Sequence, residues 1–393
     1  MSRDVVLIDG ARTAFTEFCG SFKDFTATDL GVFAAKAALQ KSGVDPSKID
    51  NVVFGNALQT SGDALFMGHH VGLRAGCPME SPGLVVNRLC GSGLQSIITA
   101  AHSIMLGDSE FGLAGGAENM TQAPFVVRGA RTGLGLGQGQ LEDYLWVALL
   151  DTYNNFSMAL TAEEVAVRYN ITREEADLHS ERSHNRALAA IEKGYFAEEI
   201  VPVEVSGRKG PIIINKDEHV KPSPVESLAK LKPRFKKDGI VTAGNASGIN
   251  DGAAAVVLTT MDNAQKEGLK PLGRLVSWGI VGVDPDIMGI GPAPAIRQAL
   301  KKAGMTLDQL DLIEINEAFA AQYLGCQKDL GFDPEIGNVN GGAVALGHPL
   351  GASGSRITLS LLYELRRRGK KYGASSLCIG GGQGIATIWE CLL

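Results

Sequence analysis

The sequence predicts an α/β protein made of two duplicated halves with a large inserted segment. Short apolar runs alternate with amphipathic stretches of helical period, 49 glycines are spread along the 393 residues, and one long pattern occurs twice. Strands that alternate with helices of about 10–15 residues favour sheets covered by helices. Two long copies indicate a duplicated domain, because solenoid repeats are much shorter and more numerous.

The repeat is clearest in residues 34–58 and 294–319, which read AAKAALQKSGVDPSKIDNVVFGNAL and PAIRQALKKAGMTLDQLDLIEINEAF. Each copy predicts an amphipathic helix, a glycine stop, a polar connection and an apolar strand. A second helix then leads to a glycine-rich strand end, FGLAGGAEN at 111–119 and SSLCIGGGQG at 375–384. At a constant offset of 261 residues, the paired positions are Leu39 and Leu300, Gly43 and Gly304, Asp50 and Asp311, and Gly93 and Gly354.

The segment between the halves repeats in neither of them and reads as an insert. TAEEVA and TREEAD inside it have the Thr-x-x-Glu form of a capping box, which predicts helix starts near residues 161 and 172. The expected units are an N-terminal half at 1–120 plus about 250–268, an inserted loop domain at 121–249, and a C-terminal half at 269–393.

Composition and charge exclude several classes of protein. A net charge of −6 argues against a general binder of nucleic acid or anionic membranes, which needs excess Lys and Arg. The N-terminus enters the strand-like VVLID directly, and no apolar run is expected to reach the ~18 residues of a membrane span, so we expect a cytoplasmic protein without one. Six cysteines without CxxC spacing indicate free thiols rather than disulfides or a zinc site.

Cys90 is the first candidate for chemistry. It follows the apolar GLVV and precedes Gly91-Ser92-Gly93 and a helix, so a strand-to-helix elbow would present its sulfur at a helix N-terminus. The helix dipole and free N–H groups there lower a thiol pKa from ~8.5, and the thiolate is the nucleophile. Packing of a small side chain is the competing interpretation.

The second half supplies possible partners for this thiol. His348 lies in VNGGAVALGHPLGASGSR, in the loop that the repeat makes equivalent to the Cys90 elbow. If the halves pack about a pseudo-twofold axis, Cys90 and His348 form a nucleophile–base pair. Cys378 opens the run CIGGGQG at the C-terminal end of a strand, where active sites of such sheets gather.

Two further features have both a structural and a functional interpretation. Asn316, where a strand turns into a helix, is either a helix cap or an amide that orients water. Residues 206–237 hold nine Lys or Arg against three acidic residues. They form either a solvated charged face or a site for a phosphate-bearing ligand.

Five ordered motifs together resemble the thiolase family over essentially the whole chain: NRLCGSG, VTAGNASGINDGAA, NEAFAAQ, GHPLGASG and CIGGGQG. KDFTATDL, HVGLRAG, LEDYLWV and DPDIMGIGPAPA are similar to 3-ketoacyl-CoA thiolases of the mitochondrial type. The resemblance implies the thiolase fold, a five-layer αβαβα sandwich. It also implies a CoA-dependent acyltransferase that condenses two acetyl-CoA molecules or cleaves 3-ketoacyl-CoA with CoA, through an acyl-Cys90 intermediate.

The resemblance also implies roles for individual residues. His348 would take the proton of Cys90, and Cys378 would exchange the α-proton of acetyl-CoA. His348 and a water held by Asn316 would form one oxyanion site, and the N–H groups of Cys90 and Gly380 another. No metal and no permanently bound cofactor are expected, with CoA as a substrate.

CoA contacts follow from the same resemblance. Ser247 would lie beside the pantetheine, and Lys221 and Ser227 on the nucleotide side, so the basic segment would meet phosphates. The acyl pocket would be lined by Met158, Phe235, Met288 and Phe319. Short-chain biosynthetic thiolases carry His-Met where this chain has Ser157-Met158, which puts strict specificity for acetoacetyl-CoA in doubt.

Other functions remain alternatives at this point. Decarboxylating ketoacyl-carrier-protein synthases share the fold but use cysteine with two histidines, and a lipid-binding protein could retain the scaffold without chemistry. A dinucleotide-binding dehydrogenase is rejected, because neither GLGLGQGQ nor GGGQGIA satisfies G-x-G-x-x-G with its later acidic residue. Family members assemble as dimers or tetramers, and residues 123–141 would supply contacts between dimers.

Overall fold

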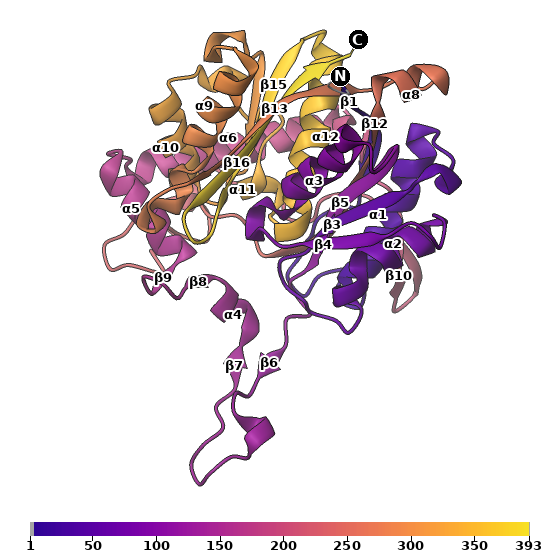
Figure 1. Ribbon diagram of the computed structural model, residues 1–393. Helices are drawn as coiled ribbons and strands as arrows, with labels where there is room; N and C mark the ends of the chain where they lie inside the picture. The colour runs from indigo at the N-terminus through magenta and orange to yellow at the C-terminus, as the bar shows by residue number, and fades with distance from the viewer. Residues whose placement is uncertain (1–3, 393) are drawn as a thin grey trace.

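The computed structural model describes residues 4–392 and shows the expected five layers (Figure 1). The helices α3 (Ser92–Leu106) and α12 (Leu350–Arg368) form the central layer, and their apolar side chains share one buried core with strands of both halves. One sheet and the outer helices α1 (Ala27–Ser42) and α2 (Met67–Ala75) lie on one side. The second sheet, with α9 (Pro292–Ala303) and α10 (Ala320–Leu330), lies on the other.

The two halves have the same strand order, which is the structural form of the sequence repeat. Each half has two neighbouring parallel strands followed by two antiparallel ones, and the first half adds β4 as a further parallel strand at its edge. A short pairing of β1 with β13 joins the halves into one sheet. The order in the first half is β4 (Gly83–Val86), β3 (Asn51–Gly55), β5 (Phe111–Asn119), β12 (Asn250–Thr260) and β1 (Val5–Arg12). In the second it is β14 (Leu312–Ile315), β15 (Tyr372–Ile379), β16 (Gln383–Cys391) and β13 (Gly273–Gly282).

Paired glycines of the repeat have physical roles. Gly43 and Gly304 end α1 and α9 in the left-handed region, with φ of 69° and 65°. Gly93 and Gly354 let the first turns of α3 and α12 touch. A Cβ at Gly93 would lie 2.6 Å from the Gly351 carbonyl oxygen, and one at Gly354 would lie 2.2 Å from the Leu94 nitrogen. The loops that carry Cys90 and His348 therefore meet at one place.

The insert, residues 121–249, leaves the first half after β5 and returns at β12. Its pair β6 and β7 extends away from the body as an arm (Figure 1), and α4 at the base of this arm packs with Leu58, Met120 and Leu350. The helices α5 and α6 pack against the second half. The remaining elements are β2 (Thr16–Glu17), β6 (Phe125–Val126), β7 (Glu142–Asp143), α4 (Tyr144–Ala148), β8 (Leu150–Asp151), β9 (Phe156–Ser157), α5 (Met158–Arg168), α6 (Arg173–Glu192), β10 (Val203–Gly207), β11 (Gly210–Ile214), α7 (Val225–Leu228), α8 (Met261–Lys266) and α11 (Ala343–Leu346).

One of the two predicted helix starts is confirmed and the other is wrong. Thr172 caps α6 in a complete capping box with Glu175. The helix predicted to start near 161 begins at Met158 instead, with Ser157 as its cap. Thr161 lies inside that helix and donates its hydroxyl proton to the Met158 carbonyl at 2.7 Å.

A single stretch among residues 4–392, Leu89–Leu106, is long and apolar enough to cross a membrane by length and composition alone. The expectation that no apolar run is long enough to span a membrane is therefore wrong for Leu89–Leu106. This stretch is essentially α3, whose side chains pack against α12 in the central layer, so the core of the fold accounts for its apolar character.

Candidate active site

Cys90 lies at the predicted elbow, in the turn Leu89–Gly91 between β4 and α3. Leu89 has a φ of 46°, a left-handed conformation that costs a residue with a side chain about 1–3 kcal/mol. Two side chains hold the turn: Asn87 Oδ1 accepts the Leu89 N–H at 2.9 Å, and Ser92 Oγ accepts the Arg88 N–H at 2.9 Å. Strain next to a partly exposed thiol is typical of a functional turn.

The protonation state of Cys90 differs from the expectation. Burial raises the pKa of its thiol to about 11, while the N–H groups of Gly380 and of Cys90 itself oppose the shift. The cost of burying a negative sulfur thus exceeds the stabilisation from the helix terminus. In the free protein Cys90 is a neutral thiol, and it needs a base.

Alkylation of the free protein tests this state. Because the thiol pKa is about 11, the rate at which iodoacetamide modifies Cys90 should still rise between pH 7 and 10. The increase should be about tenfold per pH unit, in step with the thiolate fraction. Mass spectrometry of the Cys90 peptide gives the rate, and a small peptide thiol with the ordinary pKa of ~8.5 is the reference. A plateau near neutral pH would show a thiolate instead.

His348 lies between α11 and α12 with its ring oriented by one serine. Its Nδ1 is 2.6 Å from Ser353 Oγ, and that hydroxyl donates its only proton to the Pro349 carbonyl at 2.9 Å. Nδ1–H is therefore the donor to Ser353, and Nε2 keeps its lone pair. Burial lowers the pKa of His348 to about 3, and the charge of Arg356 adds to the shift. The imidazole is neutral, with Nε2 able to accept a proton.

The side-chain amide of Asn316 donates a hydrogen bond to this nitrogen. Its Nδ2 lies 3.3 Å from His348 Nε2, and its buried Oδ1 has no hydrogen-bond partner within residues 4–392. The helix-cap interpretation is wrong, because α10 starts at Ala320 and its cap position is Phe319. An amide with one free, buried oxygen beside a base fits the alternative, a group that orients water.

Glu317 anchors the Asn316 loop to α6 and to the His348 side of the site. One carboxylate oxygen accepts from His179 Nε2 at 3.1 Å and Asn338 Nδ2 at 2.9 Å. The other accepts from Ser183 Oγ at 2.7 Å and the Val344 N–H at 3.2 Å. Burial opposes ionisation, yet His179 and these hydrogen bonds lower the pKa of Glu317 to about 2. Because the Glu317 carboxylate has four hydrogen-bond partners, it fixes the position of the neighbouring residue Asn316.

Cys378 ends β15 and is fully buried against Met288 and Ala318. Burial raises the pKa of its thiol well above the ordinary value, and Cys90 contributes to the shift. The two sulfur atoms therefore lie within electrostatic reach of one another. The N–H of Gly380, two residues further on, acts against the rise in the Cys90 thiol pKa.

Glu118 joins the two halves at the site and was not identified from the sequence. At the end of β5, its carboxylate accepts from Asn56 Nδ2 at 2.8 Å and from the N–H groups of Ala57, Leu58 and Gly351 at 3.0, 2.9 and 2.8 Å. Burial raises the pKa of Glu118 to about 7 against the pull of these N–H groups. It ties the loop after β3 to the first turn of α12.

A cleft of about 520 Å³ leads to these groups, and His348 and Leu350 line it. Cys90 and Cys378 are not part of its surface but lie directly behind residues that are. Cys90 packs with Leu145 and Leu350, and Cys378 packs with Met158 and Phe319. A substrate that moves these side chains slightly would reach both thiols.

The structure brings most of the expected binding residues to this cleft. Met158, Phe235, Phe319 and Ser247 line it. Met288 does not line it but packs behind it against Cys378, and exposed Lys221 and Ser227 lie outside it.

Sequence reasoning missed several lining side chains: Leu145, Trp146 and Leu149 from α4 and the residue after it, Met120 after β5, and His219 in the insert. The apolar run LWVALL was the available signal for the α4 group. Among the residues that the structure describes, no group of three or more His, Cys, Asp or Glu side chains could hold a metal ion.

Comparisons with known proteins agree with this geometry. The chain is 53% identical to the mitochondrial 3-ketoacyl-CoA thiolase of Homo sapiens, over 98% of each chain. It is 46% identical to an acetyl-CoA acetyltransferase of Syntrophomonas wolfei, over 100% of each. The crystal structure of human mitochondrial 3-ketoacyl-CoA thiolase in complex with CoA matches with a TM-score of 0.97 and 52% identity, over 99% of this chain and 98% of that one.

These relatives contradict the expected cytoplasmic location. A protein that is 53% identical over 98% of the chain is mitochondrial, and a bacterial protein is also similar. An N-terminus that enters a strand directly therefore does not exclude an organelle.

Models of two domain families cover nearly the whole chain. The one described as thiolase, N-terminal domain, matches residues 5–262, and the one described as thiolase, C-terminal domain, matches residues 269–391. The boundary falls between β12 and β13, where the first half of the repeat ends and the second begins. Both domain models, the similar solved structure and the meeting of the two halves at Cys90 and His348 agree with one another. The chain therefore belongs to the thiolase family.

Proposed function

We propose that this protein is an acetyl-CoA C-acyltransferase that cleaves 3-ketoacyl-CoA with CoA and runs the reverse condensation of acetyl-CoA. The observation that carries the proposal is that a neutral thiol, Cys90, lies at a turn that meets the turn of a neutral imidazole, His348, whose Nε2 keeps its lone pair. Such a pair transfers a proton only when sulfur attacks a carbonyl, so the nucleophile forms on demand. Thiolysis shortens a 3-ketoacyl chain, as β-oxidation of fatty acids requires.

In thiolysis the proton transfers balance as follows. Cys90 sulfur bonds to the 3-keto carbon as His348 Nε2 takes the thiol proton. The bond between the α- and β-carbons breaks, and Cys378 donates its proton to the α-carbon, which releases acetyl-CoA. CoA then gives its thiol proton to Cys378 and attacks the acyl group. Cys90 leaves as a thiolate and recovers its proton from His348.

Fixed donors stabilise the negative charge at each carbonyl. We assign the N–H groups of Cys90 and Gly380 to the acyl group on Cys90. His348, with a water held by the free Oδ1 of Asn316, serves the enolate of acetyl-CoA. Donors of this kind are typically worth ~2.7–4 kcal/mol each in the transition state. This assignment is supported by the free, buried Asn316 Oδ1, and it would fail if Asn316→Ala left kcat unchanged.

We further propose that CoA lies along the cleft, with its pantetheine beside Ser247 and its phosphates toward the exposed Lys221 and Ser227. Met158, Phe235 and Phe319 would face the acyl chain, with Met288 behind them. The assembly that we propose is a dimer or a dimer of dimers joined through the arm, where Phe125, Leu136 and Leu141 are exposed. The mass from light scattering tests this assembly.

The thiolysis rate against chain length, from four to sixteen carbons, tests the activity and its specificity together. Position 157 carries Ser, a small residue that caps α5 and lines the cleft, and apolar side chains from α4 also line it. We therefore expect kcat/KM at six to ten carbons to match or exceed that at four, since each buried CH₂ contributes ~0.8 kcal/mol. A profile confined to four carbons would contradict the broad pocket, and no thiolysis at any length would contradict the proposed activity.

A further inference from the structure

One wall of the cleft is a segment without regular secondary structure. The wall loop, residues 229–249, runs from the end of α7 to the start of β12 without a helix or strand. Phe235, Ser247 and Ile249 of this loop line the cleft. Its position therefore depends on side chains that hold it from outside.

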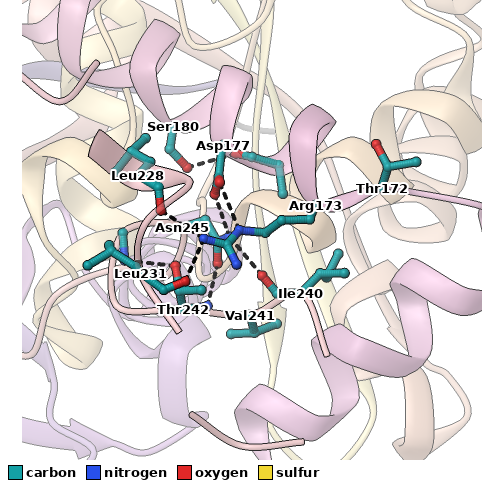
Figure 2. A network of polar contacts seen from close by, with 12 residues as sticks. Thr172, Arg173, Asp177, Ser180, Leu228, Leu231, Ile240, Val241, Thr242 and Asn245 are labelled. Carbon is teal, nitrogen blue, oxygen red and sulfur yellow. Dashed lines mark hydrogen bonds and ion pairs between the residues drawn. The ribbon is translucent and has the colours of Figure 1, made fainter. Parts of the chain in front are cut away.

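Figure 2 shows the network that does so, centred on Asp177 of α6. The Asp177 side chain is 1% exposed, and its two oxygens accept from Arg173 Nε at 2.7 Å and from Asn245 Nδ2 at 2.9 Å. Arg173 Nη2 donates in addition to the carbonyls of Leu228 and Leu231 at 2.8 and 2.9 Å. The ion pair between Arg173 and Asp177 thus holds the start of the wall loop directly and the segment that lines the cleft through Asn245.

Asn245 passes this anchorage to the rest of the loop. Its Oδ1 accepts the Thr242 N–H at 2.8 Å, and its Nδ2 also donates to the Ile240 carbonyl at 2.9 Å. Its main-chain carbonyl accepts the Ala320 N–H at 2.9 Å, which links the loop to the residues after Asn316. The Asn245 side chain therefore bonds α6 through Asp177 and the wall loop through Thr242 and Ile240.

We propose that Arg173, Asp177 and Asn245 are positioning residues that hold the wall loop in place for CoA. They contact neither Cys90 nor His348, so they set the affinity for the CoA portion of the substrates and leave the chemical step unchanged. The inference rests on the proposed function, because the wall loop matters only if CoA lies along it. Hydrogen bonds to charged groups contribute enough that loss of one changes an equilibrium by about tenfold.

The test uses Arg173, because this side chain is 24% exposed, whereas Asp177 and Asn245 are buried. Arg173→Met removes the hydrogen bonds to both carbonyls and to Asp177, and Arg173→Lys keeps the positive charge without the guanidinium geometry. Arg182→Met is the matched control. It removes an arginine of the same helix that likewise bonds a carbonyl and a carboxylate, those of Pro334 and Glu335, away from the cleft.

We expect Arg173→Met to raise KM for CoA by about tenfold with kcat changed less than about twofold, Arg173→Lys to lie between, and Arg182→Met to match the parent protein. Equal KM values for Arg173→Met and Arg182→Met would overturn the proposal, as would a fall in Tm without a change in KM.

Calorimetric titration with CoA separates this inference from the proposed function. Weaker CoA binding by Arg173→Met than by Arg182→Met supports the positioning role even if thiolysis is absent, and equal binding refutes it.

Discussion

Replacement of Cys90 by alanine is expected to abolish thiolysis of acetoacetyl-CoA and covalent labelling by acetyl-CoA. Alanine has no sulfur to form the acyl thioester, and loss of a covalent nucleophile can cost about a million-fold in kcat. The neutral pair in the resting site gives no alternative nucleophile, because Cys378 is fully buried behind Met158 and Phe319. The decay of acetoacetyl-CoA absorbance and radiolabel in the Cys90 peptide measure the two effects.

Cys19→Ser is the control for this experiment, because Cys19 is an exposed thiol of the same half. It should keep both activity and labelling at Cys90. An active, acetyl-labelled Cys90→Ala protein would contradict the nucleophile assignment and with it the acyl-enzyme route.

Replacement of Cys378 by alanine should separate the two halves of the reaction. Acylation of Cys90 needs only His348 as base, so some acetyl labelling should remain. Exchange of the acetyl-CoA methyl protons with heavy water should be lost, because the departing CoA takes the Cys378 proton and the thiolate that remains is the group that removes and returns the α-proton. General acid–base groups typically contribute ~10²–10⁴-fold, so we expect exchange to fall by at least about a hundredfold. Proton NMR in heavy water measures the exchange.

Cys326→Ala is the matched control, since Cys326 is another fully buried thiol of the second half. Its Sγ contacts the Gly289 carbonyl and Gln322, and it packs in the core under α9 and α10 instead of with Met288 and Ala318. This variant should lose some stability and keep exchange. Normal exchange by Cys378→Ala would refute the assigned role, and equal loss in both variants would attribute the effect to packing.

The two helices of the insert show when a local signal suffices. Thr172 and Glu175 are three residues apart and satisfy one another, so the start of α6 was predictable. The same Thr-x-x-Glu pattern at Thr161 does not mark the start of a helix. Residues 156–157 pair with 150–151 as β9 and β8, which puts Ser157 at the cap position and starts α5 earlier. That pairing is a contact between segments, and the capping pattern does not contain it.

The site shows the same division. That the turns of Cys90 and His348 meet was predictable, because both are glycine-rich and the repeat places them at equivalent positions. Glu118 and Glu317 were not, because their partners are spread over distant segments. A carboxylate that accepts four hydrogen bonds from such segments has no local pattern.

By itself the sequence determined the duplication, the five-layer fold through its family resemblance, and the identity of the two thiols and the imidazole. Those features are encoded by spacing and by glycines, which act locally. Only the tertiary structure decided their protonation. The helix terminus alone predicted a Cys90 thiolate, but the packing of both halves around it raises its pKa to about 11 and lowers that of His348 to about 3. Desolvation depends on every neighbour of a group at once, so it exists only after the chain has folded.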